Sequence, residues 1–258
     1  MTDYQVSLSP DEQIDTVNEH VRLIRRKNGL TFGTDAYLLA AFVRPQPHET
    51  VVDLGSGTGI LPLLLLARGK IRTAVAVEIQ DCFADLIGRN AALNGVSDRV
   101  RVLCTDVRDL HPRDTGGEVA LVVSNPPYMK TETGKRNAHD EKFIARHEVF
   151  GGIGDFCAAA SRVLKHGGRF VCVFRPDRLT ELLSGMRDAH LEPKRMVFVH
   201  ADEESEPSSV LIEAVKGGAP SLRIDPPLLL HACEKFPDGT RKLTARAQKI
   251  YDTCSFFD

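Results

Sequence analysis

The amino-acid sequence predicts an α/β fold in which helices cover both faces of a mostly parallel sheet. Apolar runs of strand length alternate with helix-length segments through most of the 258 residues, an order typical of parallel sheets buried between helices. Glycines or polar residues directly follow several of these runs, at the edge where sheets of this kind bind ligands. The chain is 42% hydrophobic and 26% charged, a composition that indicates a globular protein and not a disordered one.

The first half of the sheet is predicted from short apolar runs that end in glycine or acidic residues. We expect strands at 51–54, 73–77, 99–103 and 119–123, with helices at 59–68 and 81–93. Gly69 ends the first helix, and Asn94-Gly95 supplies the C-terminal stop of the second.

The second half of the sheet is predicted to end in a hairpin. A helix at 153–164 is followed by a Gly167-Gly168 turn, a strand at 169–174 and a helix at 177–189. Two last strands, 196–200 and 209–215, are joined by the acidic loop 201–208 and are expected to pair antiparallel. The prediction is therefore a sheet of seven strands.

The chain length fits one domain. We expect residues 51–216 to form its core, residues 1–50 an extension with an entry helix at 35–43, and residues 217–258 a tail with a short helix at 244–251.

Composition also limits the cellular setting. The polar first 20 residues argue against a secretory signal, and the longest apolar run, 60–67, is too short to span a membrane. Six scattered cysteines without a C-x-x-C pair favour reduced thiols in the cytoplasm and no structural zinc. The net charge of −2 means that a nucleic-acid partner requires a local basic patch.

Three alternate glycines follow the first strand, in Asp53-Leu54-Gly55-Ser56-Gly57-Thr58-Gly59. Glycines let the backbone turn sharply and approach a ligand closely. A dinucleotide fingerprint would need a small residue where Ile60 or Pro62 stands, and a P-loop would need Ser or Thr where Ile71 follows Gly69-Lys70. The remaining pattern, D-x-G-x-G-x-G, resembles the first motif of S-adenosylmethionine-dependent methyltransferases. Seven strands ending in a hairpin are likewise similar to their common class I fold.

Acidic residues close the next two strands and extend this site. The Glu78 carboxylate has oxygens for both ribose hydroxyls of the cofactor, and Asp106 is placed to accept from the adenine amino group. Ile79 and Val107 are expected to flank the adenine ring. The alternative is that each acid is an N-cap or a solvated loop residue. The predicted contacts of S-adenosylmethionine, whose product is S-adenosylhomocysteine, are Asp53, Gly55, Ser56, Gly57, Thr58, Gly59, Glu78, Ile79, Asp106, Val107 and Asn125.

The fourth strand ends in Ser124-Asn125-Pro126-Pro127-Tyr128. The lone pair of an exocyclic amine is delocalised, so acceptors aimed at its hydrogens favour a tetrahedral, nucleophilic nitrogen. The Asn125 side-chain oxygen and the Pro126 carbonyl are candidates, held in place by the double proline. Tyr128 is placed to stack on the target ring. We assign Asn125, Pro126 and Tyr128 catalytic roles; the alternative is a loop that simply ends a strand.

Further segments resemble one family, the bacterial tRNA1(Val) (adenine-37-N6)-methyltransferases. They are Phe32-Gly33-Thr34-Asp35, Ala145-Arg146-His147-Glu148, Phe174-Arg175-Pro176, Glu192-Pro193-Lys194-Arg195, and Lys216-Gly217-Gly218 followed by Pro226-Pro227. The resemblance implies N6-methylation of the adenine beside the anticodon of one tRNA. It also implies that Thr34 and Asp35 border the methionine part of the cofactor.

Other substrates remain open at this point. Glu148-Val149-Phe150-Gly151-Gly152 resembles protein-glutamine N5-methyltransferases that act on release factors and also carry N-P-P-Y. Those enzymes usually have a larger helical domain before the first strand, whereas about 50 residues precede it here. Methylation of an amino group in rRNA or DNA is a further alternative. A non-catalytic binding module would predict an incomplete tetrapeptide, and the tetrapeptide is intact.

For a tRNA partner, basic residues are the candidate phosphate contacts, and tRNA binding should then weaken with salt. Any one of them is alternatively a solvated surface charge. No membrane and no metal are expected, and a monomer is the favoured state. The candidate RNA contacts are Arg25, Arg26, Lys27, Lys130, Lys135, Arg136 and Arg146.

Overall fold

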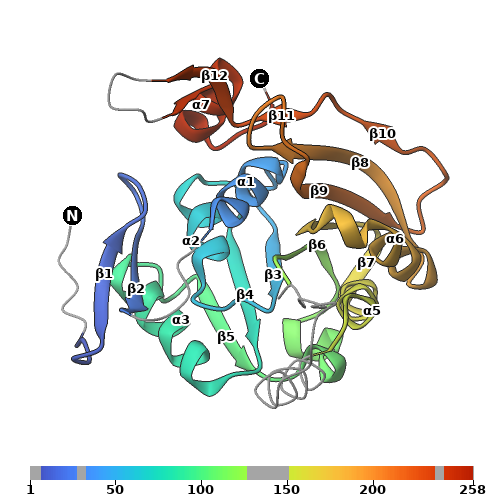
Figure 1. Ribbon diagram of the computed structural model, residues 1–258. Coiled ribbons are helices and arrows are strands. Elements are labelled where there is room, and N and C mark those ends of the chain that lie inside the picture. The colour runs from blue at the N-terminus through green and yellow to red at the C-terminus, as the bar shows by residue number, and fades with distance from the viewer. Residues whose placement is uncertain (1–6, 28–32, 127–150, 236–240, 258) are drawn as a thin grey trace, which may run out of the picture.

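The computed structural model describes residues 7–27, 33–126, 151–235 and 241–257, and its main feature is a mixed sheet between helices (Figure 1). The sheet has the strand order β10-β8-β9-β7-β6-β3-β4-β5, and β11 also pairs with β8. Its strands are β3 (Thr50–Leu54), β4 (Thr73–Glu78), β5 (Val100–Cys104), β6 (Val119–Ser124), β7 (Leu164–Phe174), β8 (Leu191–His200), β9 (Pro207–Lys216), β10 (Arg223–Ile224) and β11 (Leu228–Leu229).

The described helices follow the predicted pattern closely. They are α1 (Thr34–Phe42), α2 (Ile60–Ala67), α3 (Asp81–Leu93), α5 (Ile153–Val163), α6 (Leu179–Asp188) and α7 (Ala245–Thr253). Short 3-10 helices are η1 (Val107–Asp109), η2 (Pro112–Thr115) and η3 (Pro176–Arg178). None of the helices in the described ranges is both long enough and apolar enough to cross a membrane.

The predicted α/β class and the terminal hairpin are confirmed. β3 pairs parallel with both β4 and β6, and β7 runs parallel to β6. Among the described strands of this core, only β9 is reversed, because it pairs antiparallel with both β7 and β8. The chain passes from β3 outward to β4 and β5 and then returns to the other side of β3 as β6. Strand order therefore reverses beside β3, where ligands bind in doubly wound sheets.

Several predicted boundaries are wrong for local reasons. Leu164 begins β7 instead of ending a helix, and the Gly167-Gly168 pair lies inside that strand, where the register with β6 shifts. The β8 strand begins at Leu191, before Pro193, because the antiparallel pairing with β9 continues past that proline. The helix predicted from residue 177 is divided into η3 and α6.

The predicted seven strands do not include two short strands and two hairpins at the periphery. β10 and β11 add to the β8 edge, two residues each. β1 (Glu12–Thr16) and β2 (Arg22–Arg26) pair within the extension before the core. β12 (His231–Lys235) and β13 (Arg241–Leu243) pair within the tail. These strands are short or polar, so they lack the apolar run that identifies a core strand.

Two hydrophobic clusters fill the two sides of the sheet. One contains the buried residues of α1 and α2 with alternate residues of the strands, such as Val171 and Val173 of β7. The other contains α5 and α6 with Phe170 and Cys172, the intervening residues of that strand. Figure 1 shows α1 and α2 on the opposite side of the sheet from α5 and α6. The period-2 alternation of a strand thus builds both layers from one sequence.

Buried cations hold the C-terminal end of α1. The Lys70 ammonium donates hydrogen bonds to the carbonyls of Ala40, Ala41 and Val43 at 2.7, 3.0 and 2.8 Å. Arg195 donates to the Phe42 carbonyl at 2.7 Å. Carbonyls at the end of a helix lack partners within the helix, and cations also interact favourably with its negative end. The two side chains therefore fix α1 against the sheet.

We expect Lys70→Met to lower the free energy of unfolding by about 2 kcal/mol, since three buried carbonyls would lose a charged donor. Urea denaturation of the cofactor-free protein measures this value. Lys165→Met is the matched control, because the Lys165 ammonium forms only an exposed ion pair with Glu49 at 3.5 Å. Its effect is expected within about 0.5 kcal/mol. Equal effects of the two substitutions would contradict the anchoring role of Lys70.

Candidate active site

The carboxyl ends of β3, β4 and β6 bring the two predicted motifs to one edge of the sheet. Leu54 of β3 pairs in register with Val77 of β4, and Asp53 pairs with Val123 of β6. The glycine loop therefore begins beside the end of β6. Asn125 is the residue that directly follows this strand. The Ser124 hydroxyl, fully buried, donates to the Leu54 carbonyl at 2.8 Å and ties the two strand ends together.

The glycine loop has the backbone conformation that its sequence predicts. Gly55, Gly57 and Gly59 all have positive φ angles, of 71°, 57° and 81°. A Cβ at Gly55 would meet the Phe156 ring at 3.2 Å, whereas one at Gly57 would have no heavy atom of a described residue within 4 Å. Gly55 is thus required by packing and by φ, while Gly57 borders open space. The loop leaves room for a ligand against its middle glycine.

Glu78 connects the end of β4 to this loop. Its Oε2 accepts the Gly57 amide at 2.9 Å, and its Oε1 accepts the Gln80 amide at 3.0 Å. The side chain is 5% exposed. Each carboxylate oxygen accepts about two hydrogen bonds, so each retains capacity for a ligand hydroxyl. Glu78 orders the loop and also presents acceptors beside it.

The Asp53 carboxylate stabilises the glycine loop through a hydrogen bond from Ser56. Its side chain is 1% exposed and accepts the Ser56 hydroxyl at 2.6 Å. Burial raises the pKa of the Asp53 carboxyl from 3.8 to about 7; the Ser56 hydrogen bond opposes the rise, and the negative charge of Glu78 adds to it. The contact to Ser56 assigns Asp53 a positioning role inside the loop.

The raised pKa of Asp53 makes stability depend on pH. The folded state holds this proton more tightly than the unfolded state, so stability falls as pH rises from about 4 to about 7 and the loss is complete above that. Asp53→Asn keeps an acceptor for Ser56 but cannot ionise. We expect its thermal midpoint, relative to the parent protein, to rise between about pH 5 and about pH 8. Asp85→Asn, at an exposed carboxylate, is the control; parallel pH profiles for the parent and Asp53→Asn would exclude the role.

The Asp106 carboxylate makes local contacts. It accepts the Arg108 amide at 2.8 Å as the N-cap of η1 and forms an ion pair with the Arg108 guanidinium at 2.5 Å. The hydrogen bond from Arg108 lowers the pKa of Asp106. Asp106 is therefore an N-cap, the alternative role named for it above, and its predicted contact with the adenine amino group stays a prediction. Val107 is buried at 6% exposure, and Ile79 is half-buried.

The reactive motif is described only in part. Asn125 is half-buried and Pro126 is buried, directly after β6. Pro127 and Tyr128 lie outside the described residues, so the predicted stacking role of Tyr128 stays a prediction.

The entry helix places Thr34 and Asp35 in the first turn of α1. α7 packs against this helix: the Tyr37 hydroxyl donates to the Tyr251 carbonyl at 2.6 Å, and the two rings lie 5.3 Å apart. The tail thereby supports α1, an arrangement for which the sequence pattern gave no indication.

Asn90 of α3 is a structural residue that the sequence reasoning did not single out. It is fully buried, and its amide donates to the Thr58 carbonyl at 2.9 Å and the Ile24 carbonyl at 3.2 Å. Its oxygen accepts the Ile24 amide at 2.6 Å. Asn90 thus joins the glycine loop to the β1–β2 hairpin. The signal was present, because Asn90 lies three residues after Ile87, on the apolar face of the helix.

The candidate RNA contacts differ in their surroundings. Arg25 forms an ion pair with Asp15 across the β1–β2 hairpin. Arg26 is exposed, and the Lys27 ammonium donates to the Pro10 carbonyl at 2.8 Å. The other four candidates, Lys130, Lys135, Arg136 and Arg146, lie outside the described residues.

Comparison with known proteins identifies the family. The model of the methyltransferase small domain matches residues 27–187, more than half of the chain. The tRNA1(Val) (adenine(37)-N6)-methyltransferase of Porphyromonas gingivalis strain ATCC 33277 is 30% identical over 188 residues, which cover 70% of this chain and 72% of that relative. The protein of the same name from Enterobacter sp. strain 638 is 31% identical over 171 residues, 60% of this chain and 68% of that relative.

Solved structures support the same fold. A predicted O-methyltransferase from Agrobacterium tumefaciens has a TM-score of 0.69 at 22% identity, over 87% of this chain and 98% of that one. Geranyl diphosphate C-methyltransferase from Streptomyces coelicolor A3(2), solved with S-adenosyl-L-homocysteine, has a TM-score of 0.52 at 20% identity, over 70% of this chain and 77% of that one. With the glycine loop and Asn125-Pro126 at one sheet edge, the family model and the curated relatives establish that the chain is a methyltransferase and belongs to the tRNA1(Val) (adenine(37)-N6)-methyltransferase family.

Proposed function

We propose that this protein transfers a methyl group from S-adenosylmethionine to the N6 amino group of a tRNA adenine beside the anticodon. The observation that carries the proposal is the position of Asn125 and Pro126, directly after β6 and beside the glycine loop, in a chain 30% identical to a relative named for that reaction. Because tRNA is a cytoplasmic substrate, we also propose a cytoplasmic location, with residues 51–216 forming the catalytic core of a single domain.

The residues at the sheet edge fit the proposed cofactor. Gly57 borders open space, and the Glu78 carboxylate beside it offers acceptors suited to ribose hydroxyls. Ile79 and Val107 are candidates to flank the adenine of the cofactor, with Asp106 near its amino group. Thr34 and Asp35 of α1 are candidates to border the methionine part. When bound, S-adenosylmethionine supplies an electrophilic methyl group.

The target amine is activated by the end of β6. The Asn125 side-chain oxygen and the Pro126 carbonyl accept hydrogen bonds from the two amine hydrogens, which localises the nitrogen lone pair towards the methyl group. Such acceptors are most effective when they are fixed before the reaction. The consecutive prolines restrict the backbone and thereby help to fix them. The methylated nitrogen carries a positive charge and loses its proton to solvent, so no strong side-chain base is needed.

A methyl-transfer assay tests this reaction. Labelled S-adenosylmethionine is offered with undermodified total tRNA and, in parallel, with release-factor protein; Asn125→Ala is the inactive control. We expect label in N6-methyladenosine after digestion of the RNA to nucleosides. Label in protein would replace the proposal with glutamine methylation, the alternative indicated by the segment 148–152. Label in neither substrate would refute tRNA adenine as the target.

A further inference from the structure

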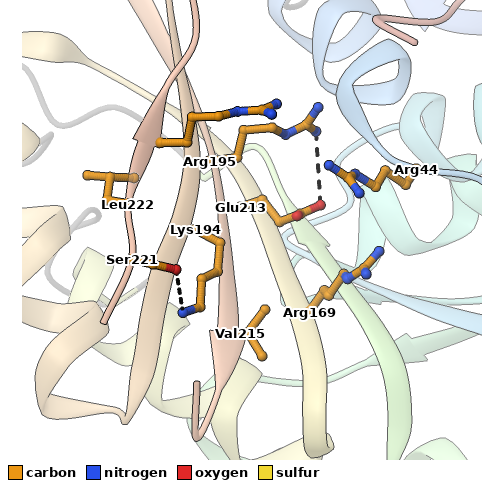
Figure 2. A pocket seen from close by; sticks show the side chains of 9 residues that line it. Arg44, Arg169, Lys194, Arg195, Glu213, Val215, Ser221 and Leu222 are labelled. Carbon is orange, nitrogen blue, oxygen red and sulfur yellow. Dashed lines mark hydrogen bonds and ion pairs between the residues drawn. The ribbon is translucent and has the colours of Figure 1, made fainter. Parts of the chain in front are cut away.

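A basic pocket of about 510 Å³ lies at the edge of the sheet opposite the candidate active site (Figure 2). Arg169, which lines it, lies five residues before Phe174, the last residue of β7. At about 3.3 Å per residue, these two residues are about 17 Å apart along the strand. The pocket is therefore separate from the glycine loop and from Asn125, and no step of the proposed reaction uses it.

Among the described residues, five cationic side chains and one carboxylate line this pocket, in a chain whose net charge is −2. The cations are Arg44, Arg169, Lys194, Arg195 and Arg223, and the carboxylate is Glu213. Such a local concentration of positive charge attracts anions whatever the charge of the whole protein.

The neighbouring acids neutralise only part of this charge. Arg223 is paired with Asp225 at 2.7 Å. Arg195 lies 3.9 Å from Glu213. Lys194 donates only to neutral oxygens, of Ala219 and Ser221. The Arg44 guanidinium stacks on the Phe257 ring at 5.1 Å.

Arg169 and Arg44 are the cations most available to a ligand. Arg169 is half-buried and forms no hydrogen bond or ion pair with another described residue. Figure 2 shows the Arg44, Arg169 and Arg195 side chains directed towards the region around Glu213, from the segment after α1, from β7 and from β8. Three guanidinium groups from separate parts of the chain therefore line the same pocket.

Buried polar atoms also lack partners here. Arg195 is 3% exposed and Glu213 is 4% exposed. Among the described residues, the Arg195 Nε, the Arg44 Nε and the Glu213 Oε2 have no hydrogen-bond partner. Burial lowers the pKa of Arg195 from its usual value to about 10; the charge of Glu213 opposes this, and the charge of Arg44 adds to it. An unpaired buried donor is costly, and an anion bound among the guanidinium groups would remove that cost.

From this geometry we infer that the pocket binds a phosphate group of a larger molecule. Planar guanidinium forks from separate elements suit the oxygens of a phosphate, and the volume lies in the range of small-molecule sites. The phosphate comes either from the backbone of the RNA substrate or from a free phosphate ester. The site itself does not depend on the proposed reaction; only its RNA source does.

The first arm of the test titrates inorganic phosphate into the full-length, cofactor-free protein at constant ionic strength, followed by calorimetry. Arg169→Met is expected to weaken phosphate binding about tenfold, the effect of one charge-assisted contact. Glu213→Gln removes the carboxylate from the described part of the lining and is expected to tighten binding. Arg101→Met is the matched control, because Arg101 is exposed on β5, at the other edge of the sheet. Circular dichroism verifies that each variant is folded.

The second arm identifies the source of the phosphate by measuring tRNA affinity at several salt concentrations. If RNA supplies it, Arg169→Met weakens tRNA binding and reduces the salt slope by about one unit, whereas Arg101→Met does not. If a free ester supplies it, only phosphate binding responds. The inference is overturned if Arg169→Met binds both phosphate and tRNA as the parent protein does. Methyl transfer is measured separately, so failure of the proposed reaction is distinguishable from failure of the pocket.

Discussion

Asn125→Ala is expected to lower the turnover of methyl transfer by about 10²–10³-fold, the usual effect of removing one fixed transition-state contact. The acceptor is needed most when the target nitrogen becomes tetrahedral, so the loss should fall on turnover and not on substrate affinity. Asn125 lies directly after β6, whereas the Asp53 and Glu78 carboxylates accept the Ser56 hydroxyl and the Gly57 amide of the glycine loop. Cofactor affinity should therefore change by no more than about twofold.

Single-turnover kinetics with saturating tRNA, together with calorimetric titration of S-adenosylmethionine, measure the two quantities separately. Asn125→Asp is the matched variant, because it retains a side-chain oxygen acceptor while losing the amide donors. It is expected to keep more turnover than Asn125→Ala. Unchanged turnover in Asn125→Ala would remove the residue from the reaction.

Glu78→Ala is expected to weaken the affinity for S-adenosylmethionine by about 100-fold, from two lost hydrogen bonds to a charged acceptor. Two effects combine in this value. The ribose hydroxyls lose their proposed acceptors, and the amides of Gly57 and Gln80 lose the oxygens that order the loop, at 2.9 and 3.0 Å. Calorimetric titration of the cofactor measures the loss.

A graded series separates ordering from direct binding. Glu78→Gln has one side-chain oxygen, whereas the amides of Gly57 and Gln80 need two acceptors. Its affinity for S-adenosylmethionine should therefore lie between those of the parent protein and Glu78→Ala. Asp85→Ala removes an exposed carboxylate from α3 and should leave affinity unchanged. Full cofactor affinity in Glu78→Ala would show that the ribose assignment is wrong.

The sequence was sufficient to predict the class of fold and the position of both motifs. Alternation of apolar strands with helices predicted the parallel core, and the acidic loop 201–208 predicted the antiparallel β8–β9 pair. D-x-G-x-G-x-G predicted a sharp backbone turn after the first strand, and Gly55, Gly57 and Gly59 make it with positive φ angles, which few other residues adopt. These features depend on local conformation and on the period-2 alternation of buried residues. Both can be recognised from the order of neighbouring residues in the sequence.

Peripheral elements were not predictable in this way. β1, β2, β12 and β13 form two-stranded hairpins with little apolar alternation, so their pairing depends on what they pack against. Asn90 lies on an apolar helix face, but its three partners, on Thr58 and Ile24, are more than 30 residues away in the chain. A polar residue in such a position has no identifiable partner until the elements are assembled.

The sequence by itself determined the methyltransferase fold, the glycine loop and the reactive motif after β6, since each is a short contiguous pattern with a local physical cause. Tertiary structure alone decided which charges gather. Arg44, Arg169, Arg195 and Glu213 come from four separate segments, and their successive spacings of 125, 26 and 18 residues in the chain carry no signal. Tertiary structure also shifts the pKa values of two acidic residues in opposite directions. Burial beside Glu78 raises the pKa of Asp53, whereas the hydrogen bond from Arg108 lowers the pKa of Asp106. Electrostatic environment is set by neighbours in space, and these were known only once the strands had been placed side by side.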